Sequence, residues 1–321
     1  MNEKRLTPSG SVWSRRVLGA LLVAVLIYLG RQYFTELERL RDADWLTVAV
    51  MVVVLLATSY AEAELTCRGL ARLGHPIGRV ESVQLGFVRS YTNLLVPRAG
   101  FGVTALYLNR VRGVPVARFG SLLLPLLVLS IVPTGVVGLG AAVILSAVGR
   151  PPSWQLVGVF LAAASAGLLL GFPRLLARFA SGRARAWLAG FVDAWEQLAR
   201  HREFLGWAVA LQLLMLVLRV ARVYLSFVAL GLSPTLSGVL FVSLAADLTM
   251  VISLTPAALG FREAFIVYTA QLTGIEPALA LAAALLDRVV VTVVLLIAGQ
   301  LSAWALVIPD QLPDAGGAGG D

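Results

Sequence analysis

Long apolar runs alternate with short arginine-rich segments along most of the chain. A helix needs about 20 mostly apolar residues to cross about 30 Å of hydrocarbon. Six runs have the length and composition of such a helix: 17–34, 45–66, 119–147, 154–172, 204–230 and 278–307. The pattern therefore predicts an all-α polytopic membrane protein with six full spans.

Turn-forming residues break two further stretches of apolar sequence. Residues 80–95 are amphipathic and end at Pro97, and residues 237–254 almost span a bilayer before Pro256. The apolar stretch 263–273 would extend only about 16 Å as a helix. Non-helical backbone at membrane depth is tolerated only where protein or a water-filled cavity surrounds it. We therefore predict two re-entrant hairpins in addition to the spans.

The composition supports a membrane protein and narrows its chemistry. Hydrophobic residues make up 59% of the chain and charged residues 14%, whereas soluble domains carry about 25% charged residues. Cys67 is the only cysteine, and His75 and His201 are the only histidines. A disulfide within the chain and a zinc cluster of thiolates are therefore excluded. The chain also lacks the Gly-x-Ser-x-Gly, His-Glu-x-x-His and Walker motifs. We expect no cofactor, no metal site and no enzyme activity.

The distribution of arginine predicts the orientation in the membrane. The formal net charge is +8. Arginines gather between residues 67 and 119 and in the predicted loop 173–203. Little net positive charge is found in three other loops: 35–44, 148–153 and 231–236. Since cytoplasmic loops carry the excess of Lys and Arg, we expect a cell-membrane protein with both termini in the cytoplasm. The basic charge then needs no nucleic-acid partner.

The two broken segments share a sequence pattern. In each, a proline precedes Gly-Phe, a tyrosine on a short helix, and a Gly–Pro turn. The matched residues are Pro97, Gly100, Phe101, Tyr107, Gly113 and Pro115, and Pro256, Gly260, Phe261, Tyr268, Gly274 and Pro277. Two ordinary loops with recurring turn residues are the alternative explanation.

The repeat predicts the organisation of the domain. Each half would hold three spans and one hairpin, and an odd number of spans inverts the second copy, as in many transporters. We expect a single transmembrane domain at 15–307, with halves at about 15–147 and 154–307. A cytoplasmic tail, 1–14, would precede it, and a disordered tail, 308–321, would follow it.

Three short motifs carry a resemblance to a known family. Thr-Pro-Ala-Ala-Leu-Gly-Phe-Arg-Glu at 255–263 resembles its Pro-Gly-Gly-x-Gly-x-Arg-Glu signature. The segment 93–100, with Asn93, Pro97, Arg98 and Gly100, resembles its Asn-x-x-x-Pro-x-Arg-x-Gly element, and 285–288 resembles its Leu-Leu-x-Arg. The family is the lysylphosphatidylglycerol synthase transmembrane-region family, the flippase-like membrane domain of multiple peptide resistance factor proteins.

The resemblance covers roughly residues 15–307 and implies lipid translocation or a related role with membrane lipids. We expect no soluble synthase domain and hence no lipid aminoacylation. This chain departs from the family's motifs at two places that bear on which lipid head group it would bind. Ala257 and Ala258 stand where the family usually has glycines, and the acid and arginine that commonly follow Gly100 are replaced by the uncharged segment 101–104.

The second hairpin and the helix before it supply the first candidate site residues. Charges at membrane depth cost about 2.5–3.5 kcal/mol each and usually face a cavity or a partner. We predict that Arg262 holds an anionic head group, with Glu263 orienting it or carrying a proton; a structural ion pair or a water-exposed tip is the alternative. Arg219 and Arg222 share a helix face and suit a phosphate, with snorkelling to the interface as the alternative.

Three more charges lie in apolar sequence: Asp247, Asp287 and Arg288. Adjacent residues on a helix do not face each other, so Asp287 and Arg288 should have different partners. We predict that Arg288 pairs with Glu263 and Asp247 with Arg262. Such a network could serve the substrate or only the structure.

The first hairpin carries Arg89, Asn93 and Arg98. Arg89 and Asn93 are four residues apart and therefore share a helix face. We predict that the three residues recruit an anionic lipid from the inner leaflet. The alternative is that the arginines only follow the positive-inside rule and lie among anionic head groups.

Together these features favour a lipid flippase for an anionic phospholipid or a lipid-linked head group. Its partners would be membrane lipid and, as open possibilities, a second copy of the chain or a lipid-synthesis protein. The alternative is a non-catalytic membrane accessory to lipid or lipid-linked glycan synthesis, or a membrane-embedded transferase.

Overall fold

Helices make up all the regular structure in the described part of the chain. The computed structural model describes residues 43–96, 98–147, 149, 152–172, 181–252 and 260–307. The helices are α3 (Trp45–Arg72), α4 (Arg79–Leu95), α5 (Ala99–Arg112), α6 (Val116–Ala147), α7 (Trp154–Gly171), α9 (Gly182–Arg200), α10 (Arg202–Ala229), α11 (Leu236–Ile252), α12 (Phe261–Leu272) and α13 (Pro277–Val307).

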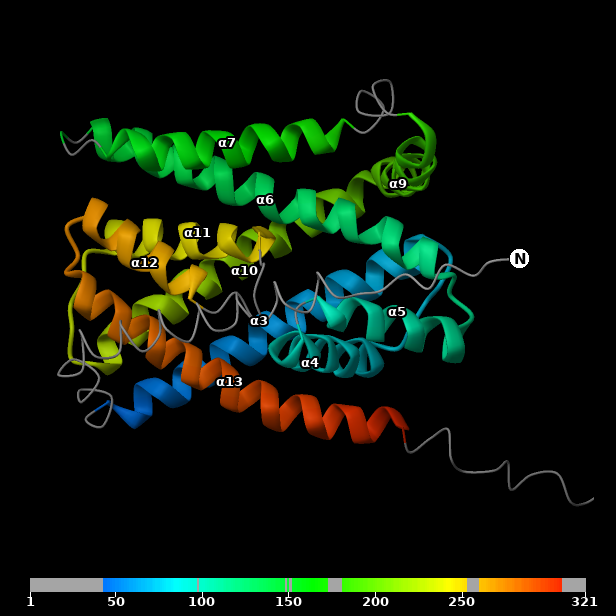
Figure 1. Ribbon diagram of the computed structural model, residues 1–321, viewed down its shortest axis with the longest axis horizontal. Coiled ribbons are helices and arrows are strands. Elements are labelled where there is room, and N and C mark those ends of the chain that lie inside the picture. The colour runs from blue at the N-terminus through cyan, green and yellow to red at the C-terminus, as the bar shows by residue number, and fades with distance from the viewer. Residues whose placement is uncertain are drawn as a thin grey trace, which may run out of the picture.

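Five of these helices are long and apolar enough to cross a membrane: α3, α6, α7, α10 and α13. They coincide with five of the six predicted spans. The other predicted span, 17–34, lies outside the described residues, as do the predicted tails. Figure 1 shows the long helices running lengthwise through the molecule, with α4 and α5 toward the end where α3 and α13 finish. The shorter helices α11 and α12 lie toward the opposite end.

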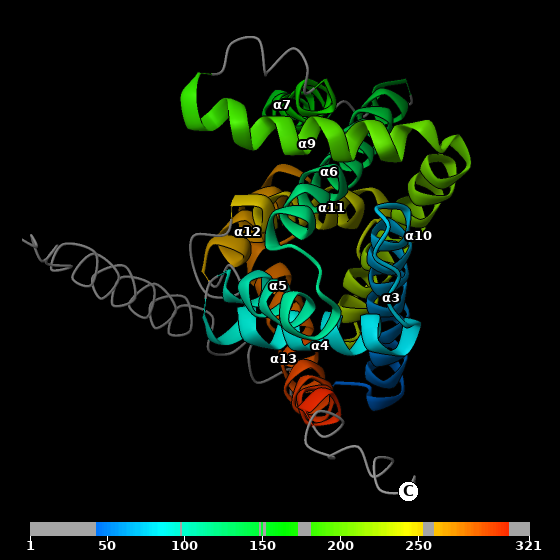
Figure 2. The same cartoon turned by 90° about the vertical axis from the view of Figure 1, so that its right-hand side faces the viewer.

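Helix α9 corrects most of the predicted loop 173–203, of which residues 173–180 lie outside the described part of the chain. Phe191, Ala194 and Leu198 are buried, and their spacing of three and four residues places them on one face of a helix. The helix is seen end-on in Figure 1 and along its length in Figure 2, so it runs across the long helices. It packs on α6, α10 and α3.

Two groups of four helices have nearly the same lengths. The first unit is α3 to α6, and the second unit is α10 to α13. Their helices contain 28 and 28, 17 and 17, 14 and 12, and 32 and 31 residues. A left-handed glycine follows the first helix of each unit, Gly74 with φ 86° and Gly231 with φ 71°.

The packing of the helices repeats in the same way. In each unit every helix packs on the next, and the first helix also packs on the last. Between the units α3 packs on α10, and the pair α4 and α13 is matched by the pair α11 and α6. Every contact therefore has a counterpart when the two units are exchanged, which is the pattern of two structural repeats.

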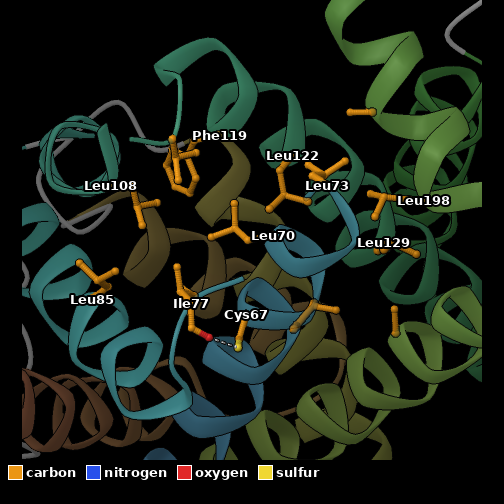
Figure 3. Close-up of a cluster of buried hydrophobic side chains, with 14 of the residues drawn as sticks. Cys67, Leu70, Leu73, Ile77, Leu85, Leu108, Phe119, Leu122, Leu129 and Leu198 are labelled. Atoms are coloured by element: carbon orange, nitrogen blue, oxygen red, sulfur yellow. Dashed lines mark hydrogen bonds between the residues drawn. The ribbon is translucent and has the colours of Figure 1, made fainter. Parts of the chain in front are cut away.

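Apolar clusters stabilise the two units and the contact between them. The cluster in Figure 3 joins Leu70, Phe119 and Leu122 of the first unit to Leu198 of α9. The thiol of Cys67 donates a hydrogen bond to the carbonyl oxygen of Ile77 at 3.2 Å within this cluster. In the second unit the corresponding cluster is formed by α10 to α13. The cluster of the second unit thus lies within its own four helices, whereas the first cluster also contains Phe204, Ala208 and Met215 of α10 and so joins the two units.

Glycines allow α6 and α7 to approach closely. A Cβ atom at Gly135 would lie 2.6 Å from the backbone nitrogen of Ala164, and one at Gly138 would lie 2.4 Å from the ring of Phe160. Small residues at helix contacts are typical of membrane proteins, because they let the backbones meet. These small-residue faces therefore pack within one chain.

Candidate functional site

The short second helix of each hairpin begins at a residue with left-handed backbone. Gly260 has φ 79° before α12, and Arg98 has φ 61° before α5. Arg98 thus occupies the place that the sequence pattern gives to Gly100, which is already the second residue of α5. Gly100 is needed for a different reason, since its Cβ would lie 2.1 Å from the carbonyl oxygen of Arg89. The predicted turn residues Pro97 and Pro256 lie outside the described residues.

A side chain fixes the start of each short helix. The backbone N–H of Gly100 donates to Oδ1 of Asn93 at 2.8 Å, and that of Gly260 donates to Oε2 of Glu263 at 2.8 Å. Both bonds satisfy backbone donors that a helix start leaves unpaired. Asn93 and Glu263 are therefore positioning residues of the two hairpins.

Glu263 also holds α12 to α13. Its side chain is 1% exposed, and its Oε1 atom lies 2.5 Å from Nη2 and 3.0 Å from Nε of Arg288. The predicted pairing of Arg288 with Glu263 is confirmed. One buried carboxylate thus connects the backbone of the hairpin with the last span.

Asp287 lies between two arginines. Its Oδ2 atom accepts a hydrogen bond from Nη2 of Arg262 at 3.0 Å, and its Oδ1 atom lies 2.9 Å from Nε of Arg222. The predicted pairing of Arg262 with Asp247 is therefore wrong. The reason is the packing, because α12 lies against α13 as well as α11 and Arg262 extends toward the last span.

The contact between Arg222 and Asp287 is an ion pair without a hydrogen bond. The N–H at Nε of Arg222 and the Oδ1 atom of Asp287 are both buried, and neither has a hydrogen-bond partner among the described residues. The two charges attract each other, yet the donor is not aligned with the acceptor. A buried donor without a partner is costly, so this contact is a weak point of the hydrogen bonding around Asp287.

Asp247 pairs with Arg219 instead. Oδ2 of Asp247 lies 3.3 Å from Nη1 of Arg219, and about a fifth to a quarter of each side chain is exposed. Arg219 and Arg222 therefore share a helix face but bind different acids.

We name these seven residues the central charge cluster: Arg219, Arg222, Asp247, Arg262, Glu263, Asp287 and Arg288. They come from α10, α11, α12 and α13. The cluster contains four arginines and three carboxylates, so it carries one surplus positive charge. In surroundings of low dielectric constant such a charge attracts an anion strongly.

The first unit contains a smaller charged site. Nη2 of Arg89 lies 2.6 Å from Oε1 of Glu62, and the guanidinium also lies over the ring of Phe101 at 5.6 Å. The sequence interpretation missed Glu62, whose only signal was an acid within an apolar run. Arg98 is exposed and makes no ion pair with any described residue. The structure therefore brings Arg89 and Asn93 into internal contacts and leaves Arg98 outside them.

The ion pairs of the two units occupy matching places with opposite charges. Glu62 and Arg219 are each the eighteenth residue of their helices, α3 and α10. Each pairs with a residue on the following helix, Arg89 on α4 and Asp247 on α11. Glu62 and Arg219 also attract each other, so the two pairs are connected across the contact of α3 with α10.

Another ion pair joins the start of α4 to the end of α5. Glu81 accepts from Nη2 and Nε of Arg112 at 2.7 and 2.9 Å, and from the hydroxyl of Tyr107 at 3.2 Å. Burial favours a higher pKa of Glu81, but the bonds from Arg112 outweigh it and hold that pKa below its ordinary value. This pair stabilises the packing of α4 on α5.

A metal site is not formed by the described residues, which contain no group of three or more His, Cys, Asp or Glu side chains close enough to hold an ion.

Comparison with known protein families gives a match over most of the chain. A family model with the description "Lysylphosphatidylglycerol synthase TM region" matches residues 14–299. The comparisons with curated proteins and with solved structures gave no match.

Proposed function

The chain belongs to the lysylphosphatidylglycerol synthase transmembrane-region family, and we propose from this that it is a lipid flippase for an anionic phospholipid or a lipid-linked head group. Membership and the five apolar helices make it a multi-pass membrane protein. The proposed localisation is the cell membrane, with both termini in the cytoplasm.

The surplus positive charge of the central charge cluster is the observation that carries the proposal. A phosphodiester has one negative charge, which matches the one unbalanced arginine. Arg222 has an unused buried donor, and guanidinium groups bind phosphate oxygens through paired hydrogen bonds. A head group entering the cluster would therefore be compensated both in charge and in hydrogen bonding.

The two matching units support the proposal. Transporters built from inverted repeats place their substrate sites where broken helices meet. We propose six spans, with 17–34 as the first, and two re-entrant hairpins, α4 with α5 and α11 with α12. The first hairpin would open to the cytoplasm and the second to the outside, because they lie toward opposite ends of the long helices (Figure 1).

In the proposed mechanism Asp287 is the counter-charge that the lipid phosphate partly replaces. In the empty protein Arg222 and Arg262 share the single negative charge of Asp287. An incoming phosphate would compete with Asp287 for Arg222, whose Nε–H is not engaged, while Arg262 keeps its hydrogen bond. Glu263 and Arg288 would hold the hairpin in place, and the acyl chains would stay in the bilayer.

Transbilayer movement in liposomes tests the proposal. Labelled phosphatidylglycerol and a labelled zwitterionic lipid are followed with the wild-type protein, with Arg222→Gln and with Arg262→Gln. Arg112→Gln is the matched control, because it also removes an arginine that pairs with a carboxylate, yet outside the cluster. We expect movement of phosphatidylglycerol with the wild type and the control, and a strong loss in both cluster variants.

The result also separates the proposal from its alternative. No acceleration by the folded wild-type protein over protein-free liposomes contradicts a flippase acting alone. It would favour a membrane accessory that works with a lipid-synthesis partner. Normal movement in well-folded Arg222→Gln and Arg262→Gln would remove the central charge cluster from the mechanism.

A further inference from the structure

A cavity opens between α3 and α10 at the arginine-rich end of the molecule. Its volume is about 590 Å³, within the range of about 300–1,000 Å³ that is usual for small-molecule sites. Six residues line it: Arg68, Ala71, Arg72, Glu203, Phe204 and Trp207. None of them belongs to the central charge cluster.

The two arginines on the wall differ in how they are held. The guanidinium of Arg68 lies 4.0 Å from the ring centroid of Trp207, and its Nε–H donates to Glu64 at 2.7 Å. Arg72 comes one helical turn later on α3, is exposed, and makes no ion pair with any described residue. The guanidinium of Arg68 is thus held by Trp207 and Glu64, whereas the guanidinium of Arg72 is exposed in the same cavity.

The matching positions of the second unit carry no charge. The positions of α10 that correspond to Arg68 and Arg72 are Leu225 and Ala229. Ala229 is 2% exposed and packs in an apolar cluster with Met51 at the start of α3. Helix packing at these positions therefore does not require the two arginines.

We propose that this cavity binds the phosphodiester of an inner-leaflet phospholipid. Arg72 and Arg68 would hold the phosphate, and Phe204 and Trp207 would contact the glycerol and the upper acyl chain. Tryptophan is typical of the level of the head groups. Among the described lining residues, Glu203 opposes the charge of the two arginines, which suits a singly charged phosphodiester better than a doubly charged phosphomonoester.

The site is separate from the proposed transport path. It holds a lipid at the cytoplasmic end of the contact between the two units, where α3 meets α10. A bound lipid would join the units there without being moved. Binding at this site therefore does not depend on flippase activity.

The test counts the lipid molecules that the purified full chain retains. Protein in detergent is incubated with mixed phosphatidylglycerol and phosphatidylcholine, and retained phosphatidylglycerol is counted by native mass spectrometry. Arg72→Gln should retain one molecule fewer than the wild type. Arg110→Gln is the matched control, because Arg110 is exposed in the last turn of α5 but does not line the cavity.

Two further measurements test whether the cavity is a separate site and which ligand it binds. In an Arg222→Gln background the loss caused by Arg72→Gln should persist, since the sites are separate. Millimolar inorganic phosphate should not displace the molecule. Displacement by phosphate alone would assign the cavity to a soluble phosphate compound and overturn the lipid assignment. Equal retention by Arg72→Gln and the wild type would overturn the site itself.

Discussion

The first unit, α3 to α6, and the second unit, α10 to α13, share one packing scheme but differ in charge. Position eighteen of the leading helix is Glu62 in one and Arg219 in the other. The described residues of the first unit form two ion pairs between its leading helix and its hairpin, Glu62 with Arg89 and Glu64 with Arg79, and the first of these has a counterpart in the second unit. In the second unit the charges are exchanged, with Arg219 on the leading helix and Asp247 on the hairpin. This pair belongs to the central charge cluster, in which Asp287 contacts two arginines.

The difference shows that fold and site are specified by separate features of the sequence. Helix length, turn glycines and apolar contacts recur in both units, so they specify the scaffold. The buried charges do not recur, apart from the inverted pair. The second unit therefore carries the proposed head-group site, and the first unit contributes Glu62, which faces it.

The largest expected effect comes from removing the central carboxylate. Asp287→Asn leaves Arg222 and Arg262 buried without their counter-charge, and breaking a buried ion pair costs about 3–5 kcal/mol. Thermal unfolding in detergent should show a large drop in stability. Asp247→Asn is the comparison, since its pair is longer and partly exposed, and its loss should be clearly smaller. Equal losses in both variants would contradict the central place of Asp287.

A second prediction concerns a glycine on the last helix of each unit, at which a neighbouring helix approaches closely. Gly138 and Gly299 are both the twenty-third residue, of α6 and α13 respectively. A Cβ atom at Gly299 would lie 2.4 Å from Cβ of Tyr91 on α4, so Gly299→Ala should cost about 1–3 kcal/mol through overpacking. Gly120→Ala has open space around it and should change the melting temperature little. A wild-type melting temperature for Gly299→Ala would show that α4 and α13 are packed less tightly than described.

The inverted ion pair offers a smaller, sharper test. In a double-mutant cycle with Glu62→Gln and Arg89→Gln we expect a coupling free energy of about 1 kcal/mol, since Glu62 is half exposed. Exchanging the two residues, Glu62→Arg with Arg89→Glu, should not restore stability, because an arginine at position 62 would face Arg219. Full recovery in the exchanged variant would mean that the two units are not coupled through this position.

The smallest effect concerns the start of the leading helix. Asp44 caps α3, and hydrogen bonds from the hydroxyl of Thr47 and from the backbone N–H groups of Leu46 and Thr47 lower its pKa. The matching cap of α10, His201, makes no such side-chain bond. Because the folded pKa is lowered, the stabilisation by ionised Asp44 is present above about pH 4 and is lost as pH falls through the folded pKa.

The melting temperature of the wild type relative to Asp44→Asn measures this effect. The difference should be positive at neutral pH and shrink toward zero below about pH 4. A difference that does not change with pH would show that the charge of Asp44 has no part in the cap.

Hydropathy was sufficient to predict five spans and both short helical pairs, because their apolar runs are long and their breaks contain glycine or proline. It failed for α9, where the many arginines of residues 173–203 indicated a loop. The spacing of Phe191, Ala194 and Leu198 was the available signal. Amphipathic periodicity, rather than mean apolarity, identifies a helix of this kind.

The site was only partly predictable for a geometric reason. Glu263 and Arg288 could be paired from their motifs, and the structure confirms that pair. The partner of Arg262 could not, because Asp287 and Arg288 lie about 100° apart around their helix. Which of the two faces α12 depends on the rotation of α13, and packing between distant segments decides that rotation.

The preference between head groups tests the proposed site most directly. In one set of liposomes, the ratio of phosphatidylglycerol to phosphatidylcholine movement is measured for the wild type and for Arg222→Gln. Because both lipids report on the same folded molecules, a partial loss of stability cancels in the ratio. We predict that the wild type prefers phosphatidylglycerol and that Arg222→Gln abolishes the preference. An unchanged preference in Arg222→Gln would contradict the central charge cluster as the head-group site.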